Sequence, residues 1–166
     1  RPTRVAMPRV VLYQPQIPPN TGNVARSCAA TGQELHLVAP LGFEISDRQV
    51  RRAGLDYWPY VPLHHHRNWL AFQQQRQARG GRLVGLSALS DAPYTAYTYS
   101  QDDWLLFGRE TDGLPADVQA ACDALLTIPM ARPRTHPGGG VRSLNLASAV
   151  AIVLFEALRQ LDSGQS

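Results

Sequence analysis

Short apolar runs alternate along the chain with longer segments in which apolar positions recur at helical spacing. The short runs predict six strands, at Arg9–Tyr13, Glu34–Val38, Trp58–Pro62, Arg82–Leu86, Trp104–Phe107 and Ala124–Ile128. The longer segments predict five helices, at Thr21–Thr31, Asp47–Ala53, Arg67–Arg79, Pro115–Ala121 and Leu144–Leu161. Strands that alternate with helices are typical of an α/β fold, with a mostly parallel sheet flanked by helices.

Residues that favour helix ends support these helices. Asn20 is a predicted N-cap of the first helix, and Gly32 is predicted to end that helix in the left-handed region. Ser143 is a predicted N-cap of the last helix, with Asn145 in its first turn.

The last predicted helix is apolar on nearly every face between Leu144 and Leu158. A helix that is apolar all round is buried on more than one side. One side covers the sheet, and a chain of this size has few elements left for the other. This pattern favours a homodimer interface, and a central core helix is the alternative.

The chain has 166 residues, of which 44% are hydrophobic and 17% charged, as in ordinary soluble domains. We predict a single domain over residues 7–162, and we interpret residues 1–6, before Met7, as an upstream extension or an expression remnant. No apolar run approaches the ~20 residues that span a bilayer. The N-terminus lacks the apolar core of a signal peptide. We therefore expect a cytoplasmic protein without a membrane partner.

All 16 basic residues are arginine, and the net charge is +3. Genome composition explains such a preference, but arginine is also the residue suited to bidentate phosphate contacts. Arg48, Arg51 and Arg52 fall on one helical face, at i, i+3 and i+4. This basic patch is either a solvated face or an RNA contact. Trp58, which follows, is interpreted as core rather than as a base-stacking residue.

In parallel sheets, ligands bind beyond the carboxyl ends of the strands. Three predicted loops there are unusual: Ser87–Ser90, Gly108–Leu114 and Pro129–Val141. Glu110 is a candidate acid, base or ribose ligand, or else a solvated turn residue. The first strand leads into no G-x-G-x-x-G turn, which argues against a dinucleotide-binding domain.

The run His64–His66 invites a metal interpretation, which the sequence does not support. Adjacent residues in an extended segment point in different directions, and no acidic or cysteine cluster accompanies them. Cys28 and Cys122 lack metal or redox spacing and are interpreted as buried small side chains.

Taken together, three segments resemble the SPOUT class of RNA methyltransferases. They are "NTGNVAR" (Asn20–Arg26), "FGRETDGLP" (Phe107–Pro115), and "IPM" (Ile128–Met130) followed by "RSLNLASAVAIVLFEALRQ" (Arg142–Gln160). The stretch "LGFEISDRQVRRAGLDYW" (Leu41–Trp58) is similar to the small tRNA 2′-O-ribose methyltransferases that act on the wobble nucleotide, position 34. The likeness runs from about Val10 to Gln160.

The resemblance implies a deep C-terminal trefoil knot, which general folding rules would exclude, and a homodimer through the first and last helices. It implies S-adenosylmethionine as cofactor, S-adenosylhomocysteine as product and no metal. The implied cofactor-binding residues are Leu86, Gly108, Ile128, Met130 and Ser143. The implied catalytic residues are Arg26, Glu110 and Asn145. The implied tRNA-binding residues are Asn20, Asn23, Arg26, Arg48, Arg51 and Arg52.

The chain departs from this pattern in the loop Ala131–Val141, which is longer than in the wobble subgroup. Its Gly-Gly-Gly run suits a cofactor lid, its Arg132, Arg134 and His136 suit RNA contacts, and an inert excursion is the third interpretation. Three rival functions remain: the same chemistry on ribosomal RNA, a non-catalytic RNA-binding module, and a flavodoxin-like nucleotide-binding domain. "QPQIPPNTGN" (Gln14–Asn23) is a poor phosphate cradle, which counts against the last.

Overall fold

The fold is described from a computed structural model, for residues 8–45, 48, 52, 55–132, 135–141 and 143–164. Its strands are β1 (Arg9–Tyr13), β2 (Leu35–Val38), β3 (Leu63–His66), β4 (Leu83–Leu86), β5 (Trp104–Phe107) and β6 (Ala124–Leu126). Its α-helices are α1 (Pro18–Thr31), α3 (Trp69–Arg79), α4 (Ala116–Ala120) and α5 (Leu146–Gly164). Among the described residues, the 3-10 helices η1 (Leu55–Tyr60) and η2 (Tyr94–Ala96) lie between strands.

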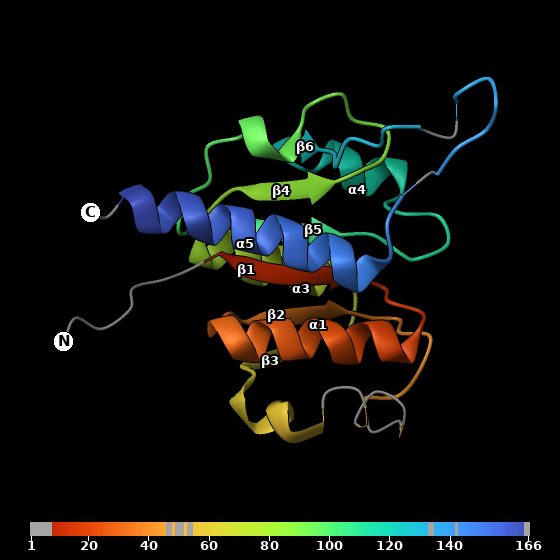
Figure 1. The fold of residues 1–166 in the computed structure, drawn as a ribbon. Helices are drawn as coiled ribbons and strands as arrows, with labels where there is room; N and C mark the ends of the chain where they lie inside the picture. Colours follow the sequence, from red (N-terminus) through yellow and green to blue (C-terminus); the bar gives the residue numbers. More distant parts are fainter. Residues whose placement is uncertain are drawn as a thin grey trace.

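The six strands form one sheet in the order β3-β2-β1-β5-β4-β6, and every pairing is parallel. All carboxyl ends therefore lie at the same edge, toward which the arrows point in Figure 1. Helices α1 and α5 run side by side over one face of the sheet, and α3 lies behind it (Figure 1). The predicted α/β class with a parallel sheet is confirmed.

Both faces of the sheet are buried, as a parallel sheet requires. Alternate residues of β1 enter different clusters. Val10 and Leu12 join an apolar cluster with α1 and α5, whereas Val11 and Tyr13 join a second cluster with α3 and α4. Cys28 is fully buried in the first cluster, where burial raises the pKa of its thiol to about 12. The interpretation of Cys28 as a small core residue is confirmed.

The predicted strand Trp58–Pro62 is wrong. That segment is largely the 3-10 helix η1, and the strand that pairs with β2 is β3, which begins at Leu63. Two prolines, Pro59 and Pro62, account for the shift, because proline has no N–H to give to a ladder. Trp58 packs against the first core cluster, which confirms its interpretation as core.

The predicted N-caps are also wrong. Helix α1 begins at Pro18, so Asn20 lies inside it and the extended Ile17 is its N-cap residue. Proline is favoured at the first helical positions, where its missing N–H costs nothing. At α5, Asn145 rather than Ser143 is the cap. Its Oδ1 accepts hydrogen bonds from the backbone N–H groups of residues 147 and 148.

Other ends and boundaries match the expectations more closely. Gly32 ends α1 in the left-handed region, with φ of 80°, as predicted. In the predicted helix Asp47–Ala53, Arg48 and Arg52 are helical and exposed, while Arg51 lies outside the described residues. No helix in the described part of the chain is long and apolar enough to cross a membrane.

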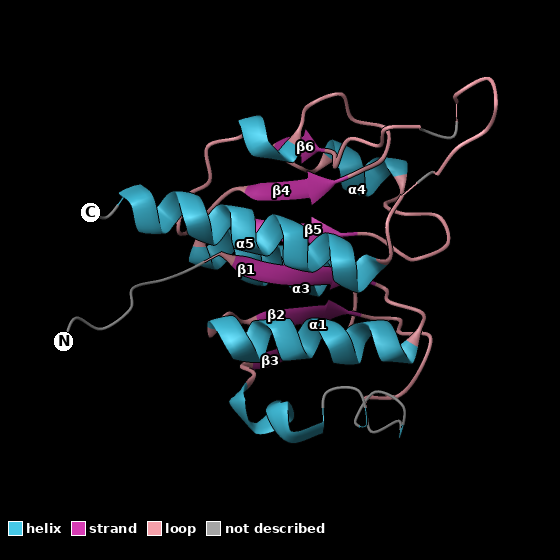
Figure 2. Cartoon of the chain, in the orientation of Figure 1, coloured by secondary structure: helices cyan, strands magenta, loops and turns pink. Residues whose placement is uncertain are grey.

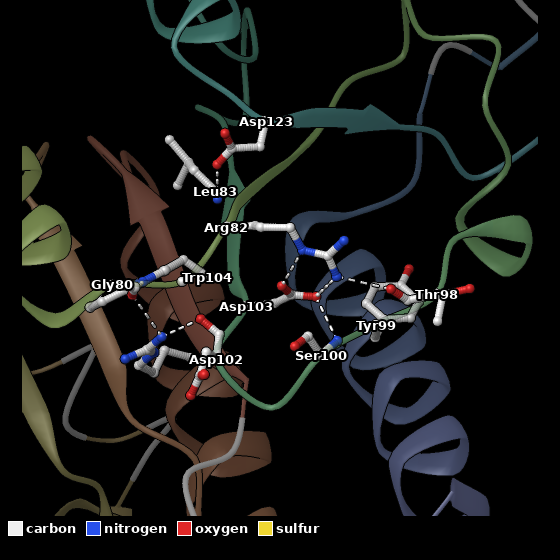
Figure 3. Close-up of polar contacts among 12 residues, drawn as sticks. Gly80, Arg82, Leu83, Thr98, Tyr99, Ser100, Asp102, Asp103, Trp104 and Asp123 are labelled. Carbon is white, nitrogen blue, oxygen red and sulfur yellow. Dashed lines mark hydrogen bonds and ion pairs between the residues drawn. The ribbon is translucent and has the colours of Figure 1, made fainter.

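The amino-terminal edge of the sheet is held by a polar network (Figure 3). The fully buried Asp103 accepts hydrogen bonds from the Arg82 guanidinium, at 3.1 and 3.2 Å, and from the Ser100 N–H, at 2.8 Å. The Trp104 indole donates to the Gly80 carbonyl at 2.9 Å. These contacts stabilise the edge opposite to the one where ligands are expected.

Candidate active site

The carboxyl edge of the sheet carries most of the long connections of the fold, drawn as loops at one end of the molecule in Figure 2. Strands β1, β5, β4 and β6 lie next to one another there, in that order, and the segments follow β1, β5 and β6. The three resembling segments, which are far apart in sequence, therefore converge at this edge.

Glu110 is held at the N-terminus of α1. Its carboxylate accepts hydrogen bonds from the backbone N–H of Gln16 at 2.8 Å and of Ile17 at 2.9 Å. The Asn20 amide donates to it at 3.3 Å. A carboxylate is favoured here, because the unpaired N–H groups and the helix dipole attract negative charge. Both oxygens are engaged, so Glu110 anchors the loop after β5 to the start of α1.

Asn20 joins this anchor to the last helix. It is 8% exposed, and its Oδ1 accepts a hydrogen bond from the Asn145 Nδ2 at 3.0 Å. Because the Asn145 Oδ1 caps α5, the orientation of its amide group is fixed by the helix. Asn20, Glu110 and Asn145, one from each resembling segment, thus form a continuous chain of hydrogen bonds.

The loop after β5 folds tightly on itself. Arg109 and Gly113 exchange backbone hydrogen bonds, at 3.1 and 2.9 Å. A Cβ built on Gly108 would lie 2.3 Å from the Gly113 carbonyl carbon, so only glycine fits at Gly108. The missing side chain at Gly108 therefore lets the two ends of this loop approach each other closely.

Sequence reasoning missed two glutamines that receive this loop. The Gln16 Oε1 accepts from the Thr111 hydroxyl at 2.8 Å, and the Gln14 Oε1 accepts from Arg109 at 2.5 Å. Gln14 has a positive φ of 48°, which is uncommon outside glycine. The signal available in the sequence was two polar residues directly after a buried strand at the ligand edge.

Arg109 is also paired within the loop. Its guanidinium donates to both oxygens of Asp112, at 2.7 and 3.1 Å. This hydrogen bonding lowers the pKa of Asp112. The pair keeps an arginine side chain folded along the loop that carries Glu110.

The predicted cofactor residues lie at neighbouring strand ends. Leu86 ends β4 and is half-buried, Gly108 follows β5, and Ile128 follows β6, which pairs with β4. Met130 is half-buried two residues further on, and Ser143 is exposed just before α5. Two branched apolar side chains, a glycine and a hydroxyl fit a flat apolar ring system with polar substituents. These residues therefore suit the nucleoside part of S-adenosylmethionine.

Residues 135–141 of the long loop project from the same edge (Figure 1). The Val141 N–H donates to the Arg132 carbonyl at 2.8 Å, which closes the base of the loop. His136 turns the chain at its tip, accepting from the N–H of Gly138 and of Gly139. Arg132 and His136 are exposed, and Arg134 lies outside the described residues.

Four of the predicted RNA-binding residues lie on the surface. Asn23 and Arg26 are exposed and three residues apart, so they share the outer face of α1. Arg48 and Arg52 are exposed on the connection between β2 and β3. Asn20, in contrast, is buried, and its side chain forms hydrogen bonds with Glu110 and Asn145.

A separate hollow of about 430 Å³ lies beyond β2. It is lined by Ala39, Leu41, Phe43, Glu44, Ile45 and His65. None of these is a predicted cofactor residue. The hollow borders the β1–α1 connection, because the Gly42 N–H donates to the Pro15 carbonyl at 2.9 Å.

Comparisons with known proteins agree with this arrangement. A tRNA (cytidine(34)-2′-O)-methyltransferase of Beijerinckia indica is 46% identical over 152 residues, covering 92% of this chain and 91% of that protein. A solved structure described as "Structural insights into the 2-OH methylation of C/U34 on tRNA" superposes with a TM-score of 0.86 at 46% identity, over 96% and 94% of the two chains. An AdoMet-bound rRNA methyltransferase from Sinorhizobium meliloti superposes with a TM-score of 0.82 at 29% identity, over 95% of this chain and 58% of that one.

The family model described as SpoU rRNA Methylase matches residues 7–155, which include Asn20, Glu110 and Asn145. The match covers most of the sequence, and the solved relatives share the fold. This chain belongs to the SpoU rRNA Methylase family.

Proposed function

We propose that this protein is an S-adenosylmethionine-dependent tRNA methyltransferase that methylates the ribose 2′-oxygen of the wobble nucleotide, position 34, a cytidine or modified uridine. The observation that carries the proposal is the Asn20–Glu110–Asn145 hydrogen-bond chain, which joins three distant segments at the ligand edge. Relatives 41–46% identical to this chain are named tRNA (cytidine(34)-2′-O)-methyltransferases, and they support the choice of substrate.

Leu86, Gly108, Ile128, Met130 and Ser143 would hold S-adenosylmethionine, at the ends of β4, β5 and β6 and before α5. When bound, S-adenosylmethionine supplies a methyl group from its sulfonium and leaves as S-adenosylhomocysteine. Apolar side chains at the strand ends exclude water from an adenine ring. Methyl transfer of this kind needs no metal at the reacting atoms.

Arg26 has an electrostatic role in this proposal. It lies on the exposed face of α1 together with Asn23. Negative charge develops on the ribose oxygen as its proton departs. A guanidinium is protonated in proteins, so it stabilises that charge and binds the adjacent phosphate rather than accepting the proton.

Glu110 and Asn145 act as positioning residues. The oxygens of Glu110 accept three hydrogen bonds at the start of α1, which fixes the helix that carries Arg26. Asn145 fixes the start of α5 and holds Asn20 in place. The rate of transfer depends on such placement, since small shifts of a reacting group are costly.

Exposed apolar side chains near the first turn of α1 and along α5 favour an assembly of two chains. Ile17, Leu144 and Phe155 are 43%, 38% and 53% exposed, at the N-terminus of α1, just before α5 and on α5. We propose a homodimer that covers this surface. The basic patch of Arg48, Arg51 and Arg52 would bind the anticodon loop of the tRNA. The sheet order fits the C-terminal trefoil knot, and a cytoplasmic location suits a tRNA substrate. Sedimentation equilibrium should give twice the chain mass of 18.3 kDa.

The first experiment is methyl transfer from labelled S-adenosylmethionine to unmodified bulk tRNA, with the labelled nucleotide mapped by nuclease digestion and mass spectrometry. Label on the ribose of nucleotide 34 is the expected result. Label on another ribose, or on ribosomal RNA alone, would overturn the proposed substrate but keep the enzyme. No label on either RNA, from a folded dimer, would favour the non-catalytic RNA-binding module.

An Arg26→Lys variant tests the role of the guanidinium. A point charge does not reproduce the planar fork, so most activity should be lost while the fold is kept. Turnover close to that of the parent protein would show that Arg26 is not needed as a bidentate group.

A further inference from the structure

A group of imidazole and carboxylate side chains lies at the amino-terminal edge of β2 and β3, opposite to the catalytic edge. Glu34 directly precedes β2, and His36 and His64 are paired across β2 and β3. The Glu34 Oε1 lies 2.8 Å from the His36 Nε2 and 3.7 Å from the His64 Nε2. All three atoms lie within 4.8 Å of one another.

We propose that Glu34, His36 and His64 form a binding site for a divalent transition-metal ion of the zinc type. Two imidazoles and one carboxylate, completed by water, are a common ligand set for Zn²⁺. Bonds of about 2.0–2.1 Å in a tetrahedron place ligand atoms about 3.3 Å apart. The distances of 2.8 and 3.7 Å from the Glu34 Oε1 to the two imidazole nitrogens lie on either side of that spacing.

The surroundings of His36 fix its ring. The ring stacks on that of His64, with centroids 4.4 Å apart and 8° between the planes, so the partly exposed His64 turns for both nitrogens to face one ion. The His36 ring is fully buried, with ring centroids 6.3 Å from Phe72 and 5.0 Å from Trp104. Its second nitrogen, Nδ1, lies 2.9 Å from the His66 Nε2. A hydrogen bond from the free nitrogen of a ligating histidine fixes its tautomer and ring plane. His66 supplies that partner without touching the ion.

The Glu34 carboxylate has a free oxygen lone pair with which to bind an ion. Arg79 donates to both of its oxygens at 2.9 Å, which holds the carboxylate in one orientation. A carboxylate offers about four acceptor positions, so Arg79 leaves two. Burial raises the pKa of Glu34, but hydrogen bonds from Arg79 and His36 outweigh it and lower that pKa to about 2. The carboxylate is therefore ionised.

The ion would replace the proton on the His36 Nε2. In its absence, the neutral His36 donates from Nε2–H to Glu34, and its Nδ1 accepts from the His66 Nε2–H. On binding, Nε2 and Oε1 bind the ion and the Nε2 proton leaves to solvent. Nδ1 then takes the proton of the His66 Nε2 along their hydrogen bond, and the other nitrogen of His66 takes one from solvent, so both rings stay neutral. Ions enter from solvent, because the Glu34 and His64 side chains are 28% and 35% exposed. The positive Arg79 nearby opposes a second cation, and this limits the affinity.

This site differs from the histidine run seen in the sequence. His65 points away from it and lines the hollow beyond β2. His36 and Glu34 come from the neighbouring strand and its start, about 30 positions earlier in the chain, which is why the run alone showed no acidic partner.

The test is titration of the tag-free, chelator-stripped chain with Zn²⁺ by calorimetry, with Co²⁺ absorption reporting tetrahedral coordination. We expect one ion per chain. His64→Gln should weaken binding by about tenfold or more, because it removes one of three ligands. His65→Gln is the matched control, one residue away on the other side of the strand, and should bind like the parent.

Thermal unfolding gives a second readout. An ion that binds only the folded chain raises its melting temperature. Zn²⁺ should raise the melting temperature of the parent and of His65→Gln, and much less that of His64→Gln. Equal effects in the two variants, or no saturable binding by the parent, would overturn the site. Methyl transfer is expected to be unaffected by chelators, so failure of this site leaves the proposed reaction standing.

Discussion

Replacing Glu110 with glutamine tests whether this residue holds the site together or takes part in proton transfer. Glutamine keeps the size of the side chain but offers one acceptor oxygen instead of two. In the protein the two oxygens face the N–H groups of Gln16 and Ile17. In Glu110→Gln, one of these donors meets an NH₂ group and loses its partner. The interaction of the negative charge with the start of α1 is lost as well.

The structure sets the size of the effect. An unpaired donor costs about 1–3 kcal/mol, and a charge at a helix N-terminus contributes about 0.3–1 kcal/mol. The bond to Ile17 is exposed, so water replaces it in part, and the lower half of the range applies. We expect a loss of about 1–2 kcal/mol, or a fall in melting temperature of roughly 2–8 °C for a chain of this length.

The assay is thermal and urea unfolding followed by circular dichroism, together with single-turnover methyl transfer on tRNA. Asp112→Asn is the matched control, a carboxylate in the same loop that is 61% exposed and paired with Arg109. Its stability should change little, because exposed ion pairs contribute little. Unchanged stability in Glu110→Gln with a large loss of rate would refute the anchoring role, because the carboxylate would then act in the chemistry alone.

Three further predictions follow from the contacts described. Asn145→Asp keeps the cap of α5 but faces Asn20 with an acceptor instead of a donor, so single-turnover methyl transfer should fall by about tenfold or more with little change in helicity. In filter binding, Arg48→Gln and Arg52→Gln should each make the slope of log affinity for tRNA against log salt concentration shallower by about 0.7–0.9. An unchanged slope would show that the replaced arginine does not contact the tRNA. Burial lowers the pKa of His36 to about 3, so the unfolded chain takes up the proton first as the pH falls below about 6.5. Urea unfolding with chelator present should therefore show stability falling by up to about 1.4 kcal/mol per pH unit between about pH 6.5 and 4, and His36→Phe should flatten that dependence.

The sequence by itself determined the fold class and the position of most elements. Strands that are buried on both faces appear in the sequence as continuous apolar runs. Two such runs predicted β1 and β5 with the bounds that the structure shows. The prediction was wrong at two segments that contain proline, η1 and the start of α1. A proline is accepted where the neighbouring backbone does not need its missing N–H as a donor, and the proline residue alone does not reveal this.

The candidate site was only partly visible in the sequence. Glu110 and Asn145 were singled out by their segments, but their partners lie about 90 and 125 positions away along the chain. Nothing local reveals that Glu110 binds the amides that open α1, or that Gln14 and Gln16 receive its loop. A hydrogen bond depends on distance and direction, and these are set by the packing of the whole sheet.

The histidines show the same limit most clearly. Spacing along the chain separates Glu34 and His36 from the run at His64, whereas the parallel pairing of β2 with β3 puts His36 directly opposite His64. Periodicity fixes which face of a strand a side chain occupies, so sequence could place each group on a face. Strand order and register decide which faces share a neighbour, and they follow from the burial of both sides of the sheet at once. The local sequence pattern therefore determines the fold class of the protein. The tertiary structure decides which functional groups lie next to one another.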